Sequence, residues 1–362
     1  MSIDFDPQRW DRLRETYRLW WAGELERPII PVELAGRDPG RPMPDVPRLT
    51  QATCHRLDIP ADAIVDRIDY DLSTLHFLGD AYPRVNFDAF GPVVIAAMLG
   101  ARLENSSGQV WFLPETKRPI GEIHFQFDPV NVWFQRIRDI CLAGLRRWQG
   151  RALIGMPDLG GNLDILAVFR PGEQLLLDLY DHPQEVKRLL DEAHACWHRV
   201  VEEINGILQP LNPGYSDWSG IFTERPSYML QCDFSYMIGP EMFDRFAAPE
   251  IAATCARLPY SFYHLDGVDA LVHLGSVLAI DALDGVQWVP GAGQLGCAHW
   301  PEVYRRIHAA GKKIQVVDGD LGGLDAVIRQ IGTARGVHQF LIQAPAEESH
   351  SIRDQLKAYG ID

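Results

Sequence analysis

The chain has 362 residues, of which 46% are hydrophobic and 23% charged, a composition typical of a soluble globular protein. Its formal net charge is −15. That balance argues against nucleic acid or an anionic membrane as a partner, because a basic patch would have to form against the overall negative field. The amphipathic first residues lack a signal-peptide core, and no apolar run is long enough for a membrane span. We therefore expect a soluble, cytoplasmic protein.

The first half of the chain predicts a helix, one clear strand and several short strands. Residues 6–24 carry a wide aromatic stripe, which is typical of a core helix or a subunit contact, so a homodimer is one expectation. The segment 29–34 predicts the first strand, after an N-terminal helical extension over 1–28. A loop rich in Gly and Pro follows over 35–47, and residues 48–81 suggest helical pieces. Short strands over 84–128 suggest a small inserted antiparallel sheet.

The second half alternates strands and helices. A helix is expected over 134–150, a strand over 151–159 and a long periodic helix over 182–208. Continuous apolar strands then recur, namely MLQCDFS (229–235), SFYHLDG (261–267), DGVQWVPG (284–291), KIQVVD (313–318) and HQFLIQAP (338–345), with helical segments such as 269–280 between them. Such a pattern predicts a parallel sheet covered by helices. We expect a single (β/α)₈ barrel domain over 1–362, with a doubly wound fold as the alternative.

The six cysteines are scattered and form no CxxC pair. In a chain of this size and expected compartment, they are expected to be reduced and mostly buried, since a disulfide framework is typical of small secreted domains.

Polar residues gather at the expected ends of these strands. His264 and Asp266 lie two apart on one strand and therefore point to the same side. In a barrel this edge is where side chains meet the substrate, so we expect an acid/base or metal-ligating role for them, with Asp233 on the preceding strand. For a metal, the sequence identifies only His264 and Asp266 as ligands. Metal sites of this kind usually need a third protein ligand.

Other residues at the same edge are candidates for substrate binding. Asp158 and Asp217 can serve as general acids, although an Asp after a strand is more often a helix cap, by about two to one. Aromatic and amide groups at strand ends suit a neutral or aromatic ligand. The remaining candidates are Glu33 and Arg37 after the first strand, with Tyr215, Trp288, Gln294 and Gln343.

Three segments carry a resemblance to a known family. HLDG at the end of a strand, followed by a helix and QWVPGAG, resembles the uroporphyrinogen decarboxylase superfamily, which includes cobalamin-dependent methyltransferases. The segment CDFSYMIGPEMFDRFAAPEI (232–251) is similar to the methyltransferase branch, and RPIIPVELAGRD (27–38) lies where such proteins have their first strand. The resemblance covers most of the chain and implies a barrel fold.

The resemblance also implies a function and shows two departures. Corrinoid:thiol methyltransferases carry His-x-Cys on the equivalent strand, and a Cys on the last strand completes a zinc site. This chain has Asp266 in place of the first Cys and offers Gln343 on the last strand. The decarboxylase branch uses an Arg-rich loop, of which only Arg37 remains.

We therefore expect methyl transfer between a corrinoid on a partner protein and a small acceptor, with zinc or another divalent metal an open question. The alternatives are a lyase or decarboxylase-like enzyme acting on a small polar or aromatic substrate, and a non-catalytic corrinoid- or tetrapyrrole-binding module.

Overall fold

A computed structural model describes residues 3–209 and 211–361. The α-helices are α1 (Gln8–Trp21), α2 (Ala61–Ser73), α3 (Ile95–Met98), α4 (Val132–Trp148), α5 (Asn162–Phe169), α6 (Gln174–Asp181), α7 (Pro183–Leu208), α8 (Pro240–Phe246), α9 (Ala248–Arg257), α10 (Leu274–Leu278), α11 (Pro301–Ala309), α12 (Leu321–Ile331) and α13 (Ser349–Ala358). The strands are β1 (Pro31–Ala35), β2 (Leu75–Gly79), β3 (Arg84–Val85), β4 (Arg102–Glu104), β5 (Trp111–Leu113), β6 (Leu153–Ile154), β7 (Ser227–Gln231), β8 (Tyr260–Asp266), β9 (Gly285–Val289), β10 (Lys313–Val316), β11 (Val337–Gln339) and β12 (Ile342–Ala344).

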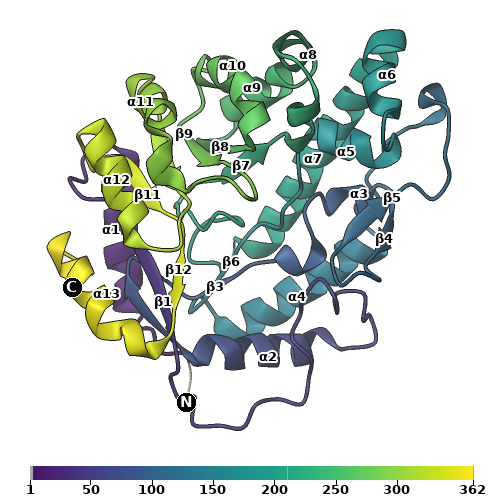
Figure 1. The fold of residues 1–362 in the computed structure, drawn as a ribbon. Helices are drawn as coiled ribbons and strands as arrows, with labels where there is room; N and C mark the ends of the chain where they lie inside the picture. Colours follow the sequence, from purple (N-terminus) through teal and green to yellow (C-terminus); the bar gives the residue numbers. More distant parts are fainter. Residues whose placement is uncertain (1–2, 210, 362) are drawn as a thin grey trace.

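The expected parallel sheet is present in the second half of the chain. Its five strands lie in the order β11-β10-β9-β8-β7, and all neighbours are parallel. Figure 1 shows helices α8 to α12 outside these strands. Leu265, Trp288 and Val316 of these strands belong to one hydrophobic cluster with side chains of those helices.

The closed ring of eight strands that the sequence suggests is not formed by continuous pairing of the named strands. A second sheet has the order β12-β1-β2, and β3 pairs in parallel with β6. One isolated parallel bridge, Ile29 to His338, connects the start of β1 to β11. The structure is therefore a mixed α/β fold in which a five-stranded parallel sheet is continued by shorter pieces.

Three local expectations are wrong in part. Leu75–Gly79, expected to be helical, is strand β2 because it pairs antiparallel with β1 along its whole length. RVNF contributes β3, which pairs with β6 and not with an inserted sheet. The inserted sheet is reduced to the antiparallel pair β4–β5, because residues 123–127 form no strand. The helix expected over 269–280 is a 3₁₀ segment, Val268–His273, followed by α10.

Other properties agree with the sequence. All six cysteines are free and buried. Within residues 3–209 and 211–361, no helix combines the length and the apolar character needed to cross a membrane.

The aromatic stripe of α1 belongs to the core. Trp10, Tyr17, Trp20 and Trp21 pack in one cluster with side chains from the beginnings and middles of several strands, among them Phe262. Helix α1 therefore covers the end of the sheet opposite to the ends of β7 and β8, where Asp233 and Asp266 lie.

Removing the largest of these side chains should strongly destabilise the fold. Trp20 is fully buried, stacks on Phe262 with ring centroids 6.0 Å apart, and donates from Nε1 to the carbonyl of Val337 at 3.1 Å. We expect Trp20→Ala to lower the free energy of unfolding by about 3–5 kcal/mol, measured by urea denaturation. Leu295→Ala, at a side chain that is 61% exposed, should change it by less than about 0.5 kcal/mol. Equal effects of the two substitutions would contradict the core position of α1.

Candidate functional site

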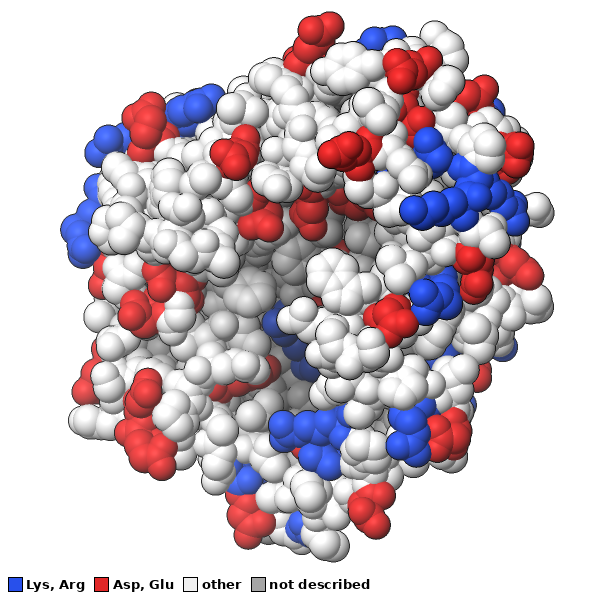
Figure 2. All heavy atoms as spheres, turned by 45° about the vertical axis from the view of Figure 1, so that its right-hand side comes forward, with Lys and Arg blue, Asp and Glu red and all other residues white. Residues whose placement is uncertain are grey.

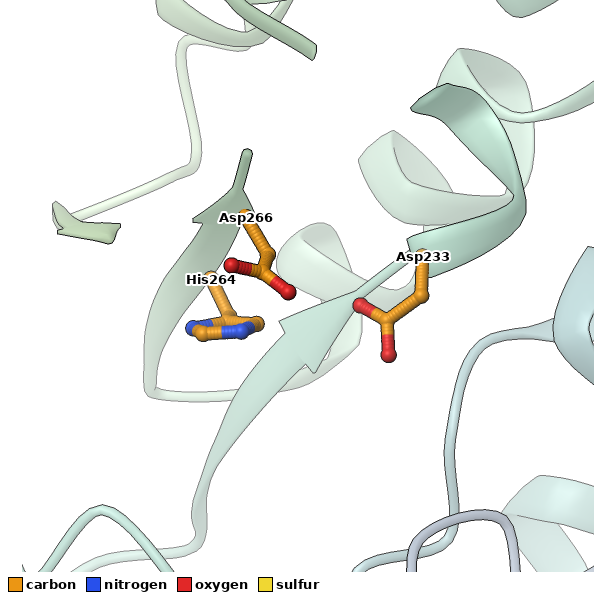
Figure 3. A group of neighbouring side chains, drawn as sticks. All are labelled: Asp233, His264 and Asp266. Atoms are coloured by element: carbon orange, nitrogen blue, oxygen red, sulfur yellow. The ribbon is translucent and has the colours of Figure 1, made fainter. Parts of the chain in front are cut away.

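Three side chains meet at the carboxyl ends of β7 and β8. One ligand atom from each of Asp233, His264 and Asp266 lies within 4.8 Å of the others. His264 and Asp266 alternate on β8 and so project from the same face of the strand. Asp233 follows β7 directly after Cys232, and β7 pairs with β8 so that Gln231 lies opposite His264. Figure 3 shows the carboxylate of Asp266 beside the imidazole ring and that of Asp233 directed toward it.

The three groups differ in exposure. His264 is half-buried, whereas both aspartates are exposed. Burial lowers the pKa of His264, although the charge of Asp266 acts in the opposite direction. Although Asp233 is exposed as a whole residue, its carboxyl group is largely surrounded by protein, and this burial together with the nearby charge of Asp266 raises the pKa of Asp233. The imidazole is therefore neutral near pH 7, which is the form that coordinates a metal or accepts a proton.

Asp164 holds the backbone from which Asp233 projects. It lies in the first turn of α5, where its carboxylate accepts from the backbone N–H of Phe234 at 2.7 Å and of Gly161 at 3.0 Å. Burial and the charge of Asp233 raise the pKa of Asp164. Asp158 lies close enough for its pKa to be affected by the charges of Asp233 and Asp164, but burial is the larger cause and raises it to about 8. Its Oδ1 accepts from the backbone N–H of Gly160 at 2.9 Å.

One aromatic ring and one amide contact His264. The indole of Trp218 meets the imidazole edge-to-face, with centroids 5.1 Å apart, and its buried Nε1 has no hydrogen-bond partner in the described part of the chain. The Oε1 of Gln287 accepts a hydrogen bond from Nδ1 of His264. The remaining ring nitrogen, Nε2, is therefore the one available to a metal or a substrate.

The structure places several candidate substrate-binding residues elsewhere. Trp288 is fully buried and packs against Trp300, because it lies opposite Leu265 and so faces the helices. Arg37 forms an ion pair with Asp4 and donates to the carbonyl of Ser73 at 2.6 Å. Gln294 is exposed in a turn after β9. None of these three has a contact with His264 among the described residues.

Two further candidates lie in the loop that precedes β7. Asp217 is buried, and its carboxylate accepts from the N–H and hydroxyl of Ser219 and from the N–H of Met229, at 2.8, 2.5 and 2.6 Å. It therefore ties the loop that carries Trp218 to β7. Tyr215 forms a two-way backbone bridge with Thr223.

Glu33 and Gln343 form a separate polar pair between β1 and β12. They are opposite in register, and Gln343 donates to Glu33 at 3.1 Å. Burial raises the pKa of Glu33, and the charge of Arg84 partly offsets that effect.

Arg84 on β3 is an interior basic residue that the sequence did not single out. Its guanidinium lies against Gly220, where an added Cβ would be 2.0 Å from Nη1. The charge of Arg84 also lowers the pKa values of Asp88 and Asp217 below what burial alone would give. Its only hydrogen bond in the described residues is a long one, 3.5 Å, to the carbonyl of Trp218. Figure 2 shows a hollow in one face of the molecule, with basic atoms inside it and acidic atoms around it.

Comparisons with known proteins identify a similar fold and no family. No family model matches the sequence, and no curated protein is similar to it. A solved structure of a methyltransferase from Methanosarcina mazei superposes with a TM-score of 0.61 and 10% sequence identity, covering 95% of this chain and 99% of that chain. At this level of identity the likeness concerns the fold alone.

Proposed function

We propose that this chain is a methyltransferase with a (β/α)₈ barrel of the uroporphyrinogen decarboxylase type, and that it moves a methyl group between a corrinoid on a partner protein and a small acceptor. The observation that carries the proposal is the group of Asp233, His264 and Asp266, gathered at the carboxyl ends of two parallel strands. In barrels of this kind, that edge holds the reacting groups. The fold of the Methanosarcina mazei methyltransferase supports the same reaction class.

The donor set fits a divalent metal with hard or borderline preference. It offers one neutral imidazole and two carboxylates, which suit Mn²⁺, Fe²⁺ or Co²⁺ at least as well as Zn²⁺. No thiolate is at hand, because Asp266 stands where zinc-dependent relatives would have Cys, and Cys297 is buried against Asp318 at 3.0 Å. A bound ion would supply Lewis-acid polarisation of an acceptor atom.

The chain's own residues then have defined parts. His264 and the two carboxylates would hold the ion, and Asp164 would keep Asp233 in place through the backbone of Phe234. The face of Trp218 would position an apolar part of the acceptor and limit the access of water to the ring of His264. This set of residues agrees with an acceptor such as a folate, which is not activated as a zinc thiolate.

A lyase is the second candidate, and Asp158 favours it. Burial raises its pKa to about 8, so that it is protonated near pH 7 and can act as a general acid. His264 would then be the base. The third candidate, a non-catalytic corrinoid- or tetrapyrrole-binding module, predicts binding without turnover.

The decisive experiment follows the absorbance of methylcobalamin with purified protein, Mn²⁺ or Co²⁺, and a panel of thiol, folate and amine acceptors. An acceptor-dependent loss of methylcobalamin that requires the metal supports methyl transfer. A bound tetrapyrrole without any turnover would favour the module, and turnover of a small acid without corrinoid would favour the lyase.

Metal content gives a separate prediction. Because both zinc cysteines are missing, protein dialysed against a mild chelator should retain less than one equivalent of zinc, measured by elemental analysis. Added Mn²⁺ or Co²⁺ should bind, and Asp266→Asn should weaken that binding by about tenfold or more. A full equivalent of zinc after dialysis, lost in His264→Ala, would mean that the ligand set has been misread.

A further inference from the structure

A chain of buried polar side chains crosses the interior from His264 to helix α1. Gln287 accepts from Nδ1 of His264 and donates from Nε2 to Oε1 of Gln315 at 2.6 Å. Gln315 contacts Nδ1 of His338 at 3.2 Å, and Nε2 of His338 lies 3.1 Å from the hydroxyl of Tyr17.

The strand register produces this chain. Each member on β8, β9, β10 and β11 lies directly opposite the next, so that His264 faces Gln287, Gln287 faces Gln315 and Gln315 faces His338. Gln287, Gln315 and His338 have at most 1% exposure. Since buried polar groups are costly without a partner, each is held to one hydrogen-bond arrangement.

One backbone carbonyl fixes the direction of every bond. The Nε2 of Gln315 donates to the carbonyl of Ser219 at 3.0 Å, and a carbonyl can only accept. The amide oxygen of Gln315 must therefore face Gln287, which has to present its own nitrogen there. The oxygen of Gln287 then faces His264, so that Nδ1 of His264 must carry a proton.

The hydrogen bonds of His338, at the other end of this series of side chains, agree with this direction. Burial lowers the pKa of His338 to about 3, so its ring is neutral. Its Nδ1 accepts from Gln315, which leaves Nε2–H to donate to Tyr17.

We infer that Gln287 and Gln315, anchored by the carbonyl of Ser219, are positioning residues that fix His264 as the Nδ1–H tautomer and leave its Nε2 lone pair for a metal ion. The tautomer follows from the hydrogen bonds alone, whereas its use in metal binding rests on the proposed function. A histidine ligand whose other nitrogen is held in this way binds a metal more tightly, because the ring need not turn or lose a proton first.

The tautomer can be measured directly by two-bond ¹H–¹⁵N correlation spectra of protein labelled with ¹⁵N-histidine, with His264→Gln used to assign the signal. The wild type should show Nδ1–H at His264. Gln315→Leu removes the anchor and lets the amide of Gln287 turn, so a fraction of His264 should change to Nε2–H. Affinity for Co²⁺, measured by titration calorimetry, should fall by about tenfold, although residue 315 does not touch His264.

Two matched variants separate positioning from packing. Gln315→Glu can still accept from Gln287 and, when protonated, donate to Ser219, so it should retain the wild-type tautomer and Co²⁺ affinity within about threefold. Gln339→Leu removes a buried glutamine of the neighbouring strand β11. Gln339 does not belong to the hydrogen-bonded series from His264 to Tyr17, and it donates instead to the carbonyl of Asp318. It should change neither readout.

The outcomes distinguish the inference from the proposed function. An Nε2–H signal for His264 in the wild type, or the same loss of affinity in all three variants, would overturn the inference. An Nδ1–H tautomer in protein that binds no divalent metal would uphold the positioning of His264 and refute the metal centre. If Gln315→Leu does not fold, the wild-type tautomer and the Gln315→Glu variant still decide.

Discussion

Replacing His264 by alanine should reduce turnover by about two or more orders of magnitude, the usual scale for loss of a general acid/base group or metal ligand. The effect should appear mainly in kcat, because the proposed function places His264 at the reacting atoms and not at the outer parts of a substrate. Binding of Mn²⁺ or Co²⁺ should be lost in parallel. The measurement needs the acceptor found in the methylcobalamin assay, with metal binding followed by calorimetry.

Stability provides the control for this variant. His264 forms one side-chain hydrogen bond, to Gln287, and is half-buried. Its loss should therefore lower the free energy of unfolding by only about 1–3 kcal/mol, the cost of leaving Gln287 unpaired. His350→Ala, at a side chain that is 94% exposed, should leave both activity and stability unchanged. His198 is unsuitable as a control, although its long helix suggests a surface position, because it is buried against Thr254. Unfolding of His264→Ala with full activity in its folded fraction would refute the site.

The gathering of Asp233, His264 and Asp266 was predictable because it depends on short-range periodicity. His264 and Asp266 share a face through the two-residue repeat of a strand, and Asp233 occupies the corresponding place after the preceding strand. The same repeat shows why Trp288 could not join them. Gln287 and Trp288 are adjacent, so only one faces the interior, and the register with His264 selects Gln287.

The remaining interior residues depend on long-range register, which a single sequence does not contain. Arg84 lies on a strand of two residues with no periodic signal. His338 and Tyr17 are 321 positions apart and meet only because α1 covers the start of the sheet. The sheet order β12-β1-β2 is a similar case, since β2 and β12 pair with β1 in ways that local apolar patterns do not specify. By contrast, the role of Asp217 could be predicted from the general preference of Asp for capping a turn, since its carboxylate accepts from the N–H of Ser219.

The second large effect concerns pH. The pKa of Asp158 is about 8 in the folded protein, against about 3.9 for an unperturbed Asp. The folded state therefore holds this proton more tightly than the unfolded chain does. Stability therefore rises as the pH falls from about 8 toward about 4, and the stabilisation by the proton is lost over the same range as the pH rises. Between pH 6.5 and pH 8, this group alone should change the free energy of unfolding by up to about 2 kcal/mol.

The buried histidines limit the pH range of this effect. Burial lowers the pKa of His198 to about 4 and that of His338 to about 3. Below about pH 6.5, the unfolded chain therefore gains protons at these residues that the folded state does not accept. In this range the two histidines therefore oppose the effect of Asp158, whereas Asp164 and Asp233, whose pKa values burial also raises, act in the same direction as Asp158.

The Asp158→Asn variant separates the contribution of this carboxyl group to the pH dependence of stability from the contributions of the buried histidines and cysteines. The variant should be more stable than the wild type above pH 8, and its stability should depend less on pH between 6.5 and 8, as measured by urea denaturation at a series of pH values. Asp269→Asn, at an exposed position, should follow the wild-type curve. If Asp158→Asn retains the full wild-type slope, the carboxyl group of Asp158 is already ionised in the folded protein. It could then not serve as the general acid that a lyase would need, and methyl transfer would be left as the better account of the site.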